Sequence, residues 1–200
     1  MMNKPVDELT TTWIDPFVAQ YQMDNTIPCL NAIHEAEQLG TWFTSIAHGG
    51  HGEKVIDAEF RDSEQINYGE FDLSDNHKVL LNFAEQCLND YLGALPEANK
   101  FPIFSRSEKC NLIRYNVGQA YHAVHSDYYP YIMERHLTFV MFLNTVDSGG
   151  ELEFVQQNLY VKPEEGKCII FPSGWTHSHH TLPADSPRYV FQFWWSFLRE

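Results

Sequence analysis

The sequence predicts an α+β fold that is mainly β, with helices in the first half of the chain and a sandwich or barrel of strands in the second. Before residue 100, apolar residues recur at helical spacing in two segments. After residue 110, short segments rich in β-branched and aromatic residues alternate with turn sequences such as DSGG (147–150) and PEEG (163–166). We therefore expect the helices to pack on one face of a sheet.

The first predicted helix covers residues 29–43, where Leu30, Ile33, Ala36 and Leu39 follow each other at three-residue steps. The second helix is expected to begin after an N-cap at Ser74-Asp75 and to end before Pro96. Its apolar positions form one stripe that should face the sheet. They are Val79, Leu80, Phe83, Ala84, Cys87, Leu88, Tyr91 and Leu92.

Between these helices, residues 44–72 combine short strand character with a glycine-rich segment, HGGHG, over residues 48–52. We interpret His48 and His51 as part of a mobile surface loop, or alternatively as part of a lid over a site. The remaining first half of the chain is expected to be irregular. The prediction is one domain over 1–200, with a helical and irregular flank at 1–104 and a β core at 105–198.

The predicted strands of the core are NLIRYNVG, HLTFVMFLNTV, GELEFV, NLYVKP, KCIIFP and RYVFQFWWSFL. In the last of them, alternation places Arg188, Val190, Gln192 and Trp194 on one face. The intervening aromatic residues, from Tyr189 to Trp195, take the other face.

Composition restricts the partners and the compartment. The 200 residues include 13 Lys and Arg against 27 Asp and Glu, a net charge of −14 that repels nucleic acid and anionic membrane surfaces. The amino-terminal residues contain no apolar signal core, and the apolar runs are too short to span a membrane. Four separated cysteines without a C-x-x-C pair fit reduced thiols. We expect a soluble cytoplasmic protein of undetermined oligomeric state.

A candidate metal site begins at His125 and Asp127, which point to the same face if they lie on a strand. Two histidines and one carboxylate form the facial ligand set of non-haem Fe(II) sites. The H-x-D pattern alone is weak evidence. The other histidine would come from residues 177–180, where His177 and His179 share a face in an extended segment and His180 points away.

Arg188 lies on the apolar strand that follows these histidines. A buried arginine is costly unless it is paired, and a carboxylate that accepts two hydrogen bonds is its natural partner. An arginine at a strand edge with its head in water is the alternative. By contrast, we interpret Arg135 as a structural salt-bridge partner and Gly149-Gly150 as a tight hairpin turn.

Short motifs follow one another over residues 110–197. They are Tyr115-x-x-Gly118-x-x-Tyr121, His125-x-Asp127, Arg135-x-x-Thr138, FLN (142–144), GGELEF (149–154), Pro163-x-x-Gly166, Ile170-Phe171, His179-x-x-x-Pro183 and Arg188-Tyr189 followed by Trp194. Taken in order, this set resembles the prolyl 4-hydroxylase-type family of 2-oxoglutarate/Fe(II) dioxygenases. In that family the distal metal ligand often precedes a proline by four residues and a basic residue by nine or ten, which selects His179 over His177.

The resemblance implies a double-stranded β-helix (jelly-roll) barrel whose catalytic residues are His125, Asp127, His179 and Arg188. The first three would bind Fe(II). Arg188 would bind the distal carboxylate of 2-oxoglutarate, and Tyr115 would donate a hydrogen bond to this co-substrate. The implied reaction hydroxylates an unactivated C–H bond with O2 and converts 2-oxoglutarate to succinate and CO2, with ascorbate as a candidate reductant.

Two positions depart from some family members. Phe142 stands where those members have a tyrosine that also contacts the carboxylate. Tyr189 and Val190 follow Arg188 where some relatives have Arg-x-Ser. Both departures concern the contacts of the co-substrate.

The expected substrate is peptidyl proline or a small amino-acid-like molecule. Loop 126–137 and segment 48–52 would frame the entrance, and Tyr128, Tyr129 and Tyr131 line a peptide groove or simply pack within the loop. The acidic chain favours neutral or basic substrates.

Three other functions compete with the hydroxylase. A nucleic-acid demethylase is disfavoured by the net charge of −14. A non-catalytic metal-binding barrel that acts as a sensor or interaction module would not need Arg188. A zinc hydrolase also leaves Arg188 without a role and lacks an evident general base.

Overall fold

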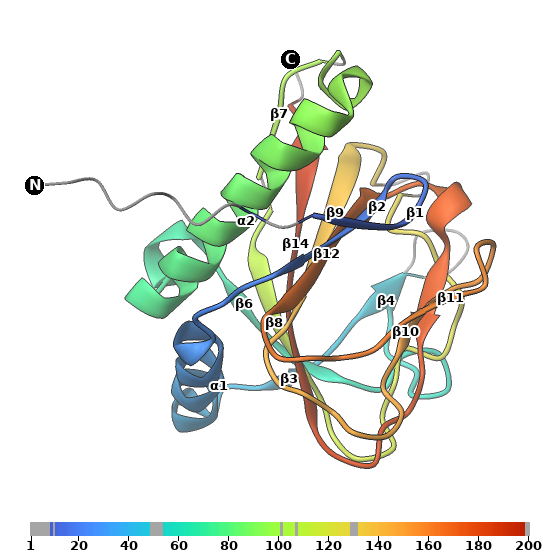
Figure 1. Cartoon of the computed structure of the whole chain (residues 1–200). Helices are drawn as coiled ribbons and strands as arrows, with labels where there is room; N and C mark the ends of the chain where they lie inside the picture. Colours follow the sequence, from blue (N-terminus) through green and yellow to red (C-terminus); the bar gives the residue numbers. More distant parts are fainter. Residues whose placement is uncertain are drawn as a thin grey trace, which may run out of the picture.

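A large antiparallel sheet organises the structure, a computed structural model that describes residues 9, 11–48, 54–100, 102–106, 108–128 and 132–198 (Figure 1). Its strands run in the order β1-β2-β12-β9-β14-β8-β6-β3, and β7 pairs with the end of β14. The strands are β1 (Thr12–Asp15), β2 (Val18–Gln22), β3 (Phe43–Thr44), β6 (Glu64–Tyr68), β7 (Phe104–Ser105), β8 (Cys110–Tyr115), β9 (Arg135–Phe142), β12 (Lys167–Pro172) and β14 (Arg188–Phe197).

A small sheet lies against one face of the large one. It contains β10 (Leu152–Phe154), β11 (Leu159–Val161) and β13 (His179–Thr181) in the order β11-β10-β13. An isolated backbone bridge between His125 and His179 extends it on the β13 side. The two sheets share an apolar core, in which the rings of Phe154 and Phe171 meet edge to face at 4.8 Å.

The helices α1 (Ile27–Leu39) and α2 (Asp75–Ala94) cover the other face of the large sheet (Figure 1). The predicted start of α2 is confirmed, since the Ser74 hydroxyl accepts a hydrogen bond from the His77 backbone nitrogen at 3.3 Å. Helix α1 begins two residues before the predicted start at residue 29 and ends four residues before the predicted end at residue 43. Its end is set by Gly40, whose φ of 63° breaks the helix.

The predicted apolar stripe of α2 is largely confirmed. Val79 is the exception, because its side chain is 42% exposed at the edge of the stripe. The buried residues of α2 are His77, Leu80, Leu81, Ala84, Cys87, Leu88 and Tyr91. They pack on residues of β9, β12 and β14 and form the main core.

The first hundred residues contain more strand than the sequence predicts. The hairpin of β1 and β2 joins the large sheet at β12, and β6 joins it at β8. These strands are short. Residues 16–17 form the turn between β1 and β2, in which Phe17 has a φ of 67°. Division of the chain at residue 104 stays a prediction, although these strands share a sheet with those of the β core.

Three short 3-10 helices and one hairpin complete the described elements. The 3-10 helices are η1 (Glu70–Asp72), η2 (Pro96–Asn99) and η3 (Trp175–His177), and the hairpin pairs β4 (Ala47–His48) with β5 (Lys54–Val55). In the described part of the chain, no helix has the length and apolar character needed to cross a membrane.

Candidate active site

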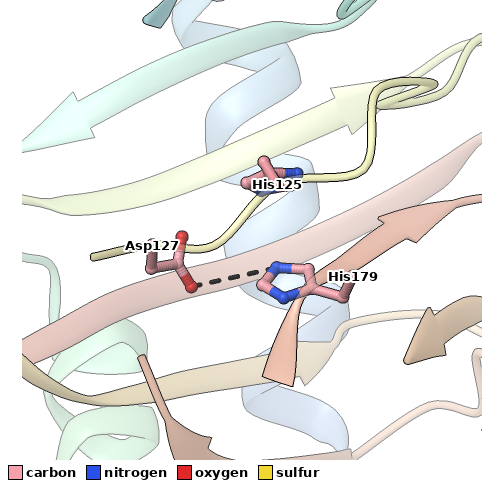
Figure 2. Close-up of side chains that lie close together, drawn as sticks. All are labelled: His125, Asp127 and His179. Atoms are coloured by element: carbon pink, nitrogen blue, oxygen red, sulfur yellow. Dashed lines mark ion pairs between the residues drawn. The ribbon is translucent and has the colours of Figure 1, made fainter. Parts of the chain in front are cut away.

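Three side chains meet between the two sheets (Figure 2). The candidate ligand atoms of His125, Asp127 and His179 all lie within 4.8 Å of one another. Figure 2 shows the three side chains turned toward a common centre, with 3.8 Å between His179 Nε2 and Asp127 Oδ2. The structure thus brings together the three residues that the sequence analysis selected as metal ligands.

Backbone pairing holds the two histidines side by side. The His125 nitrogen donates to the His179 carbonyl at 2.9 Å, and the His179 nitrogen donates back to the His125 carbonyl at 2.8 Å. The expected regular strand around His125 is wrong, because only this single bridge is formed there. Tyr128 N instead donates to Ser173 O at 2.9 Å, which ties the irregular segment to the end of β12.

The hydrogen bonds of the two imidazoles determine which nitrogen is free. His125 Nδ1 lies 3.1 Å from the Ala123 carbonyl oxygen, and His179 Nδ1 lies 2.9 Å from the His177 carbonyl oxygen. Because a carbonyl oxygen only accepts, each Nδ1 carries the proton and each neutral ring keeps its lone pair on Nε2. Burial, followed by the nearby His179, lowers the pKa of His125 to about 3, so this ring is neutral near pH 7.

Asp127 is held as a buried carboxylate. Burial alone raises its pKa, but His179, His125 and Arg135, together with a hydrogen bond from Thr138, outweigh burial and leave the pKa below its usual range. The Thr138 hydroxyl donates to Asp127 Oδ2 at 2.8 Å. Two imidazoles and one carboxylate suit a divalent transition metal.

Arg135 contacts the backbone of Asp127. Its Nη1 donates to the Asp127 backbone oxygen at 3.4 Å, and its guanidinium forms an ion pair with Glu108 at 2.6 Å. The guanidinium also lies 3.3 Å from the centre of the Trp194 ring. The predicted structural salt bridge of Arg135 is confirmed, and it lies closer to the site than the sequence indicated.

His177 and His180, the neighbours of His179 in the sequence, point away from the metal cluster. His177 ends η3, so the extended segment that would have placed it on the face of His179 does not form. Its Nε2 instead faces the Pro16 carbonyl oxygen at 3.5 Å. His180 points away from the centre, as predicted, with its Nε2 2.8 Å from Glu153 Oε2.

Arg188 is completely buried on the cavity side of β14. It pairs in register with Tyr115 of β8, and its guanidinium carbon lies 4.2 Å from the centre of that ring. Nη1 donates to the Gly150 carbonyl, whereas Nε and Nη2 have no hydrogen-bond partner among the described residues. Burial lowers the pKa of Arg188, while Tyr115 and Glu151 oppose that shift.

The tight hairpin turn expected at Gly149-Gly150 is wrong, because β9 and β10 belong to different sheets and Gly149 instead forms a bridge with Ala184. The carbonyl of Gly150 accepts a hydrogen bond from Arg188. Gly149 has a φ of 75°, and a Cβ at this position would collide with the Pro183 carbonyl oxygen. The Gly150 nitrogen donates to that same oxygen at 3.0 Å. The sequence did not predict this close approach of Gly149-Gly150 to residues 183–184.

A cavity of about 550 Å³ joins the histidine–aspartate cluster to Arg188. Both sheets supply its apolar wall, through Val140, Phe142, Leu152 and Val190. Such a volume is typical of small-molecule sites.

The segments expected at the entrance border this cavity only in part. Ala47 and Lys54, which flank segment 48–52 in the sequence, line the cavity, and so do Asp127 and Arg135 of loop 126–137. Tyr128 is 40% exposed and does not line the cavity. His51, Tyr129 and Tyr131 lie outside the described residues.

Residues 110–196 match the sequence model of the 2OG-Fe(II) oxygenase superfamily. Prolyl 4-hydroxylase 13 from Arabidopsis thaliana is 32% identical over 127 residues, which cover 50% of this chain and 46% of that protein. The match therefore spans less than half the length of this curated relative. The resemblance predicted from the ordered motifs is confirmed.

Solved structures agree on the fold. A Pseudomonas putida prolyl 4-hydroxylase superimposes with a TM-score of 0.67 at 16% identity over 92% of this chain and 94% of that one. A Trichoplax adhaerens prolyl hydroxylase, solved with a hypoxia-inducible factor peptide, gives 0.68 at 18% identity over 90% and 83%. A Paramecium bursaria Chlorella virus-1 collagen prolyl hydroxylase, solved with 2-oxoglutarate, gives 0.65 at 19% over 91% and 97%. The predicted double-stranded β-helix is confirmed.

Proposed function

We propose, on the premise that residues 110–196 belong to the 2OG-Fe(II) oxygenase superfamily, that this chain is a 2-oxoglutarate- and Fe(II)-dependent dioxygenase. It would hydroxylate an unactivated C–H bond of peptidyl proline or of a small amino-acid-like substrate. One observation carries the proposal. A buried arginine, two of whose nitrogens have no hydrogen-bond partner among the described residues, shares a cavity with two histidines and a carboxylate.

His125, Asp127 and His179 are the residues that would hold the iron. Their candidate ligand atoms all lie within 4.8 Å of one another, so one metal ion could contact all three and keep its remaining positions for other ligands. Bound Fe(II) would supply the activation of O2 and the oxidative decarboxylation of 2-oxoglutarate that accompany hydroxylation of the substrate. The carbonyl oxygens of Ala123 and His177 hold a proton on Nδ1 of the two imidazoles, and the Thr138 hydroxyl donates to the Asp127 carboxylate.

Arg188 would bind the distal carboxylate of 2-oxoglutarate. Its Nε and Nη2 are buried donors, and a carboxylate would satisfy them with charge-assisted hydrogen bonds. Tyr115, whose ring lies against the guanidinium, would donate a further hydrogen bond to the co-substrate. Phe142 offers no hydroxyl, so its contribution is to exclude water from this end of the cavity.

The class of substrate is supported by the relatives. The Arabidopsis protein is named a prolyl 4-hydroxylase, and the Trichoplax enzyme was solved with a peptide. We therefore propose O2 and a peptide or small molecule as partners, without nucleic acid or membrane, and ascorbate as the reductant to include in assays. The four cysteines are buried free thiols, which suits a reducing compartment such as the cytoplasm.

Succinate formation tests this function. Purified protein is incubated with Fe(II), 2-oxoglutarate, ascorbate, O2 and a panel of proline peptides and free amino acids. We expect succinate to form only when Fe(II) is present and one substrate to gain a single oxygen atom by mass spectrometry. Folded protein that forms no succinate with any member of the panel, and does not consume 2-oxoglutarate, would contradict the proposal.

A further inference from the structure

The cavity reverses the charge balance of the chain. The whole sequence has 13 Lys and Arg against 27 Asp and Glu, yet five basic and two acidic residues line the cavity. The basic residues are Lys54, Arg61, Lys109, Arg135 and Arg188, and the acidic residues are Glu108 and Asp127. A patch of one sign in a chain of the other sign indicates the charge of the ligand.

The proposed iron and co-substrate account for only part of this charge. Asp127 belongs to the metal cluster, Glu108 neutralises Arg135, and Arg188 would take the co-substrate carboxylate. Arg61, together with Lys54 and Lys109, forms no ion pair with any carboxylate among the described residues. A positive charge therefore remains in the cavity when the metal and 2-oxoglutarate are bound.

Arg61 is the most rigidly held of these three cations. Its Nε donates to Ser63 Oγ at 3.1 Å, Nη1 to the Ile46 carbonyl at 3.2 Å, and Nη2 to Gln65 Oε1 at 3.1 Å. Gln65 is itself oriented, since its Nε2 donates to Asn67 Oδ1 at 2.7 Å. All of these acceptors are neutral. They fix the plane of the guanidinium and leave an N–H on each of Nη1 and Nη2 for a further acceptor.

The position of Arg61 connects it to the metal cluster. Its guanidinium carbon lies 5.0 Å from the centre of the Tyr121 ring. The same ring stacks on His125 at 3.7 Å with an interplanar angle of 12°, and it also lies 6.2 Å from the Phe60 ring. An anion bound to Arg61 would thus lie one ring away from a candidate metal ligand, within reach of a small molecule or a short peptide segment that reacts there.

We propose, building on the proposed function, that Arg61 binds a carboxylate of the substrate and so determines its specificity. Lys54 and Lys109 add positive potential to the same cavity. The substrate is an amino acid or peptide with a carboxylate beside the residue that reacts, either its own α-carboxylate or an acidic side chain. The bias toward neutral or basic substrates inferred from the net charge is replaced by the opposite local preference.

Binding of matched probes to the protein loaded with Mn(II) and 2-oxoglutarate tests this inference without turnover. One pair is N-acetylproline and its neutral amide. The other is acetyl-Ala-Pro-Glu-amide and acetyl-Ala-Pro-Gln-amide. We expect the acidic member of one pair to bind about tenfold more tightly by calorimetry, because a charged hydrogen-bond pair is gained. The pair that shows the preference identifies whether the α-carboxylate or the side chain is recognised.

Variants assign the preference to Arg61. Arg61→Gln should remove the difference within the pair, and Arg61→Lys should retain only part of it, because a lysine keeps the charge without the planar donor pair. Arg114→Gln is the matched control. Arg114 is partly buried like Arg61, but Glu37 and Glu64 neutralise it and it does not line the cavity. Its substitution should leave the tenfold preference intact.

Several outcomes would overturn the role of Arg61. The first two are equal binding of the two members within both pairs and no binding of either acidic probe. The others are a preference that survives in Arg61→Gln and binding of inorganic phosphate without binding of the carboxylate probes. The proposed function fails separately. A carboxylate preference without any succinate formation would refute the oxygenase, whereas turnover without the preference would refute only the role of Arg61.

Discussion

The two faces of strand β14 perform different tasks. Toward the helices, Phe191, Phe193 and Trp195 are completely or almost completely buried in the main core. Toward the small sheet, Arg188 and Gln192 line the cavity. Adjacent residues of one strand thus contribute to stability on one side and to chemistry on the other, because side chains alternate across a sheet.

The energetic character of the faces differs accordingly. On the helix side, the rings of Phe139 and Phe193 stack at 4.9 Å, and Phe193 meets Trp195 at 5.1 Å. These apolar side chains therefore find all their packing partners within the protein. On the cavity side, Arg188 keeps two buried nitrogens without a partner in the described chain. An unsatisfied buried donor costs stability, which is expected where a ligand completes the site.

Asp127→Ala should have the largest effect. It removes the only carboxylate of the metal cluster, so we expect Fe(II)-dependent formation of succinate to fall below detection. Thr138→Val is the graded comparison. Loss of a group that orients a metal ligand costs about 10- to 100-fold in metal affinity, and Fe(II) titration should place this variant between the wild type and Asp127→Ala. Equal metal affinity in all three proteins would exclude this cluster as the metal site.

Phe193→Ala should produce the next largest change, and it should act on stability. Removing a buried phenylalanine typically costs about 3–5 kcal/mol of the free energy of unfolding. Gln192→Ala, at the neighbouring position on the cavity face, should change it by less than about 1 kcal/mol. Urea denaturation of both variants measures the difference. Similar losses in both would remove the distinction between the two faces.

Arg188→Met should separate binding from stability at one residue. The affinity for 2-oxoglutarate should fall by at least about 100-fold, because two hydrogen bonds to a charged group are lost and each contributes about 1.5–3 kcal/mol. The free energy of unfolding should stay the same or rise, since an incompletely paired buried charge is replaced by an apolar chain. Calorimetry and thermal denaturation report the two quantities. A large loss of stability with unchanged affinity would make Arg188 structural.

Ser74→Ala should give the smallest effect, on the helix side alone. Loss of the N-cap of α2 should cost about 1 kcal/mol of the free energy of unfolding, with no change in the affinity for Fe(II) or 2-oxoglutarate. Ser74→Asn keeps a capping oxygen and should retain most of the stability. A change in 2-oxoglutarate affinity would show that the two faces are coupled.

The features that could be predicted from the sequence are those set by local pattern. The cap at Ser74 and the alternation along β14 follow from nearest neighbours, and both appear in the structure. The choice of His179 over His177 needed the spacing to Pro183 and Arg188, because parity alone assumed an extended segment. That assumption fails, since η3 occupies residues 175–177.

The features that could not be predicted depend on contacts between distant segments. The β1–β2 hairpin is defined by its pairing with β12, some 150 residues later in the chain. Arg61 lies in an irregular segment, and its position in the cavity depends on Ile46, Ser63 and Gln65. Glu108 is placed by Arg135. No periodic pattern marks these residues, and their place in the cavity emerges only in the folded chain.

Anaerobic titration with Fe(II) and 2-oxoglutarate tests the central claim most directly. The wild type should develop the visible charge-transfer band of an Fe(II)–keto-acid complex. His177→Ala should keep the band and His179→Ala should lose it. His179 belongs to the candidate metal cluster, whereas His177 faces the Pro16 carbonyl oxygen. Loss of the band in His177→Ala alone would move the ligand by two residues. A wild type that binds metal but shows no band would contradict the oxygenase site.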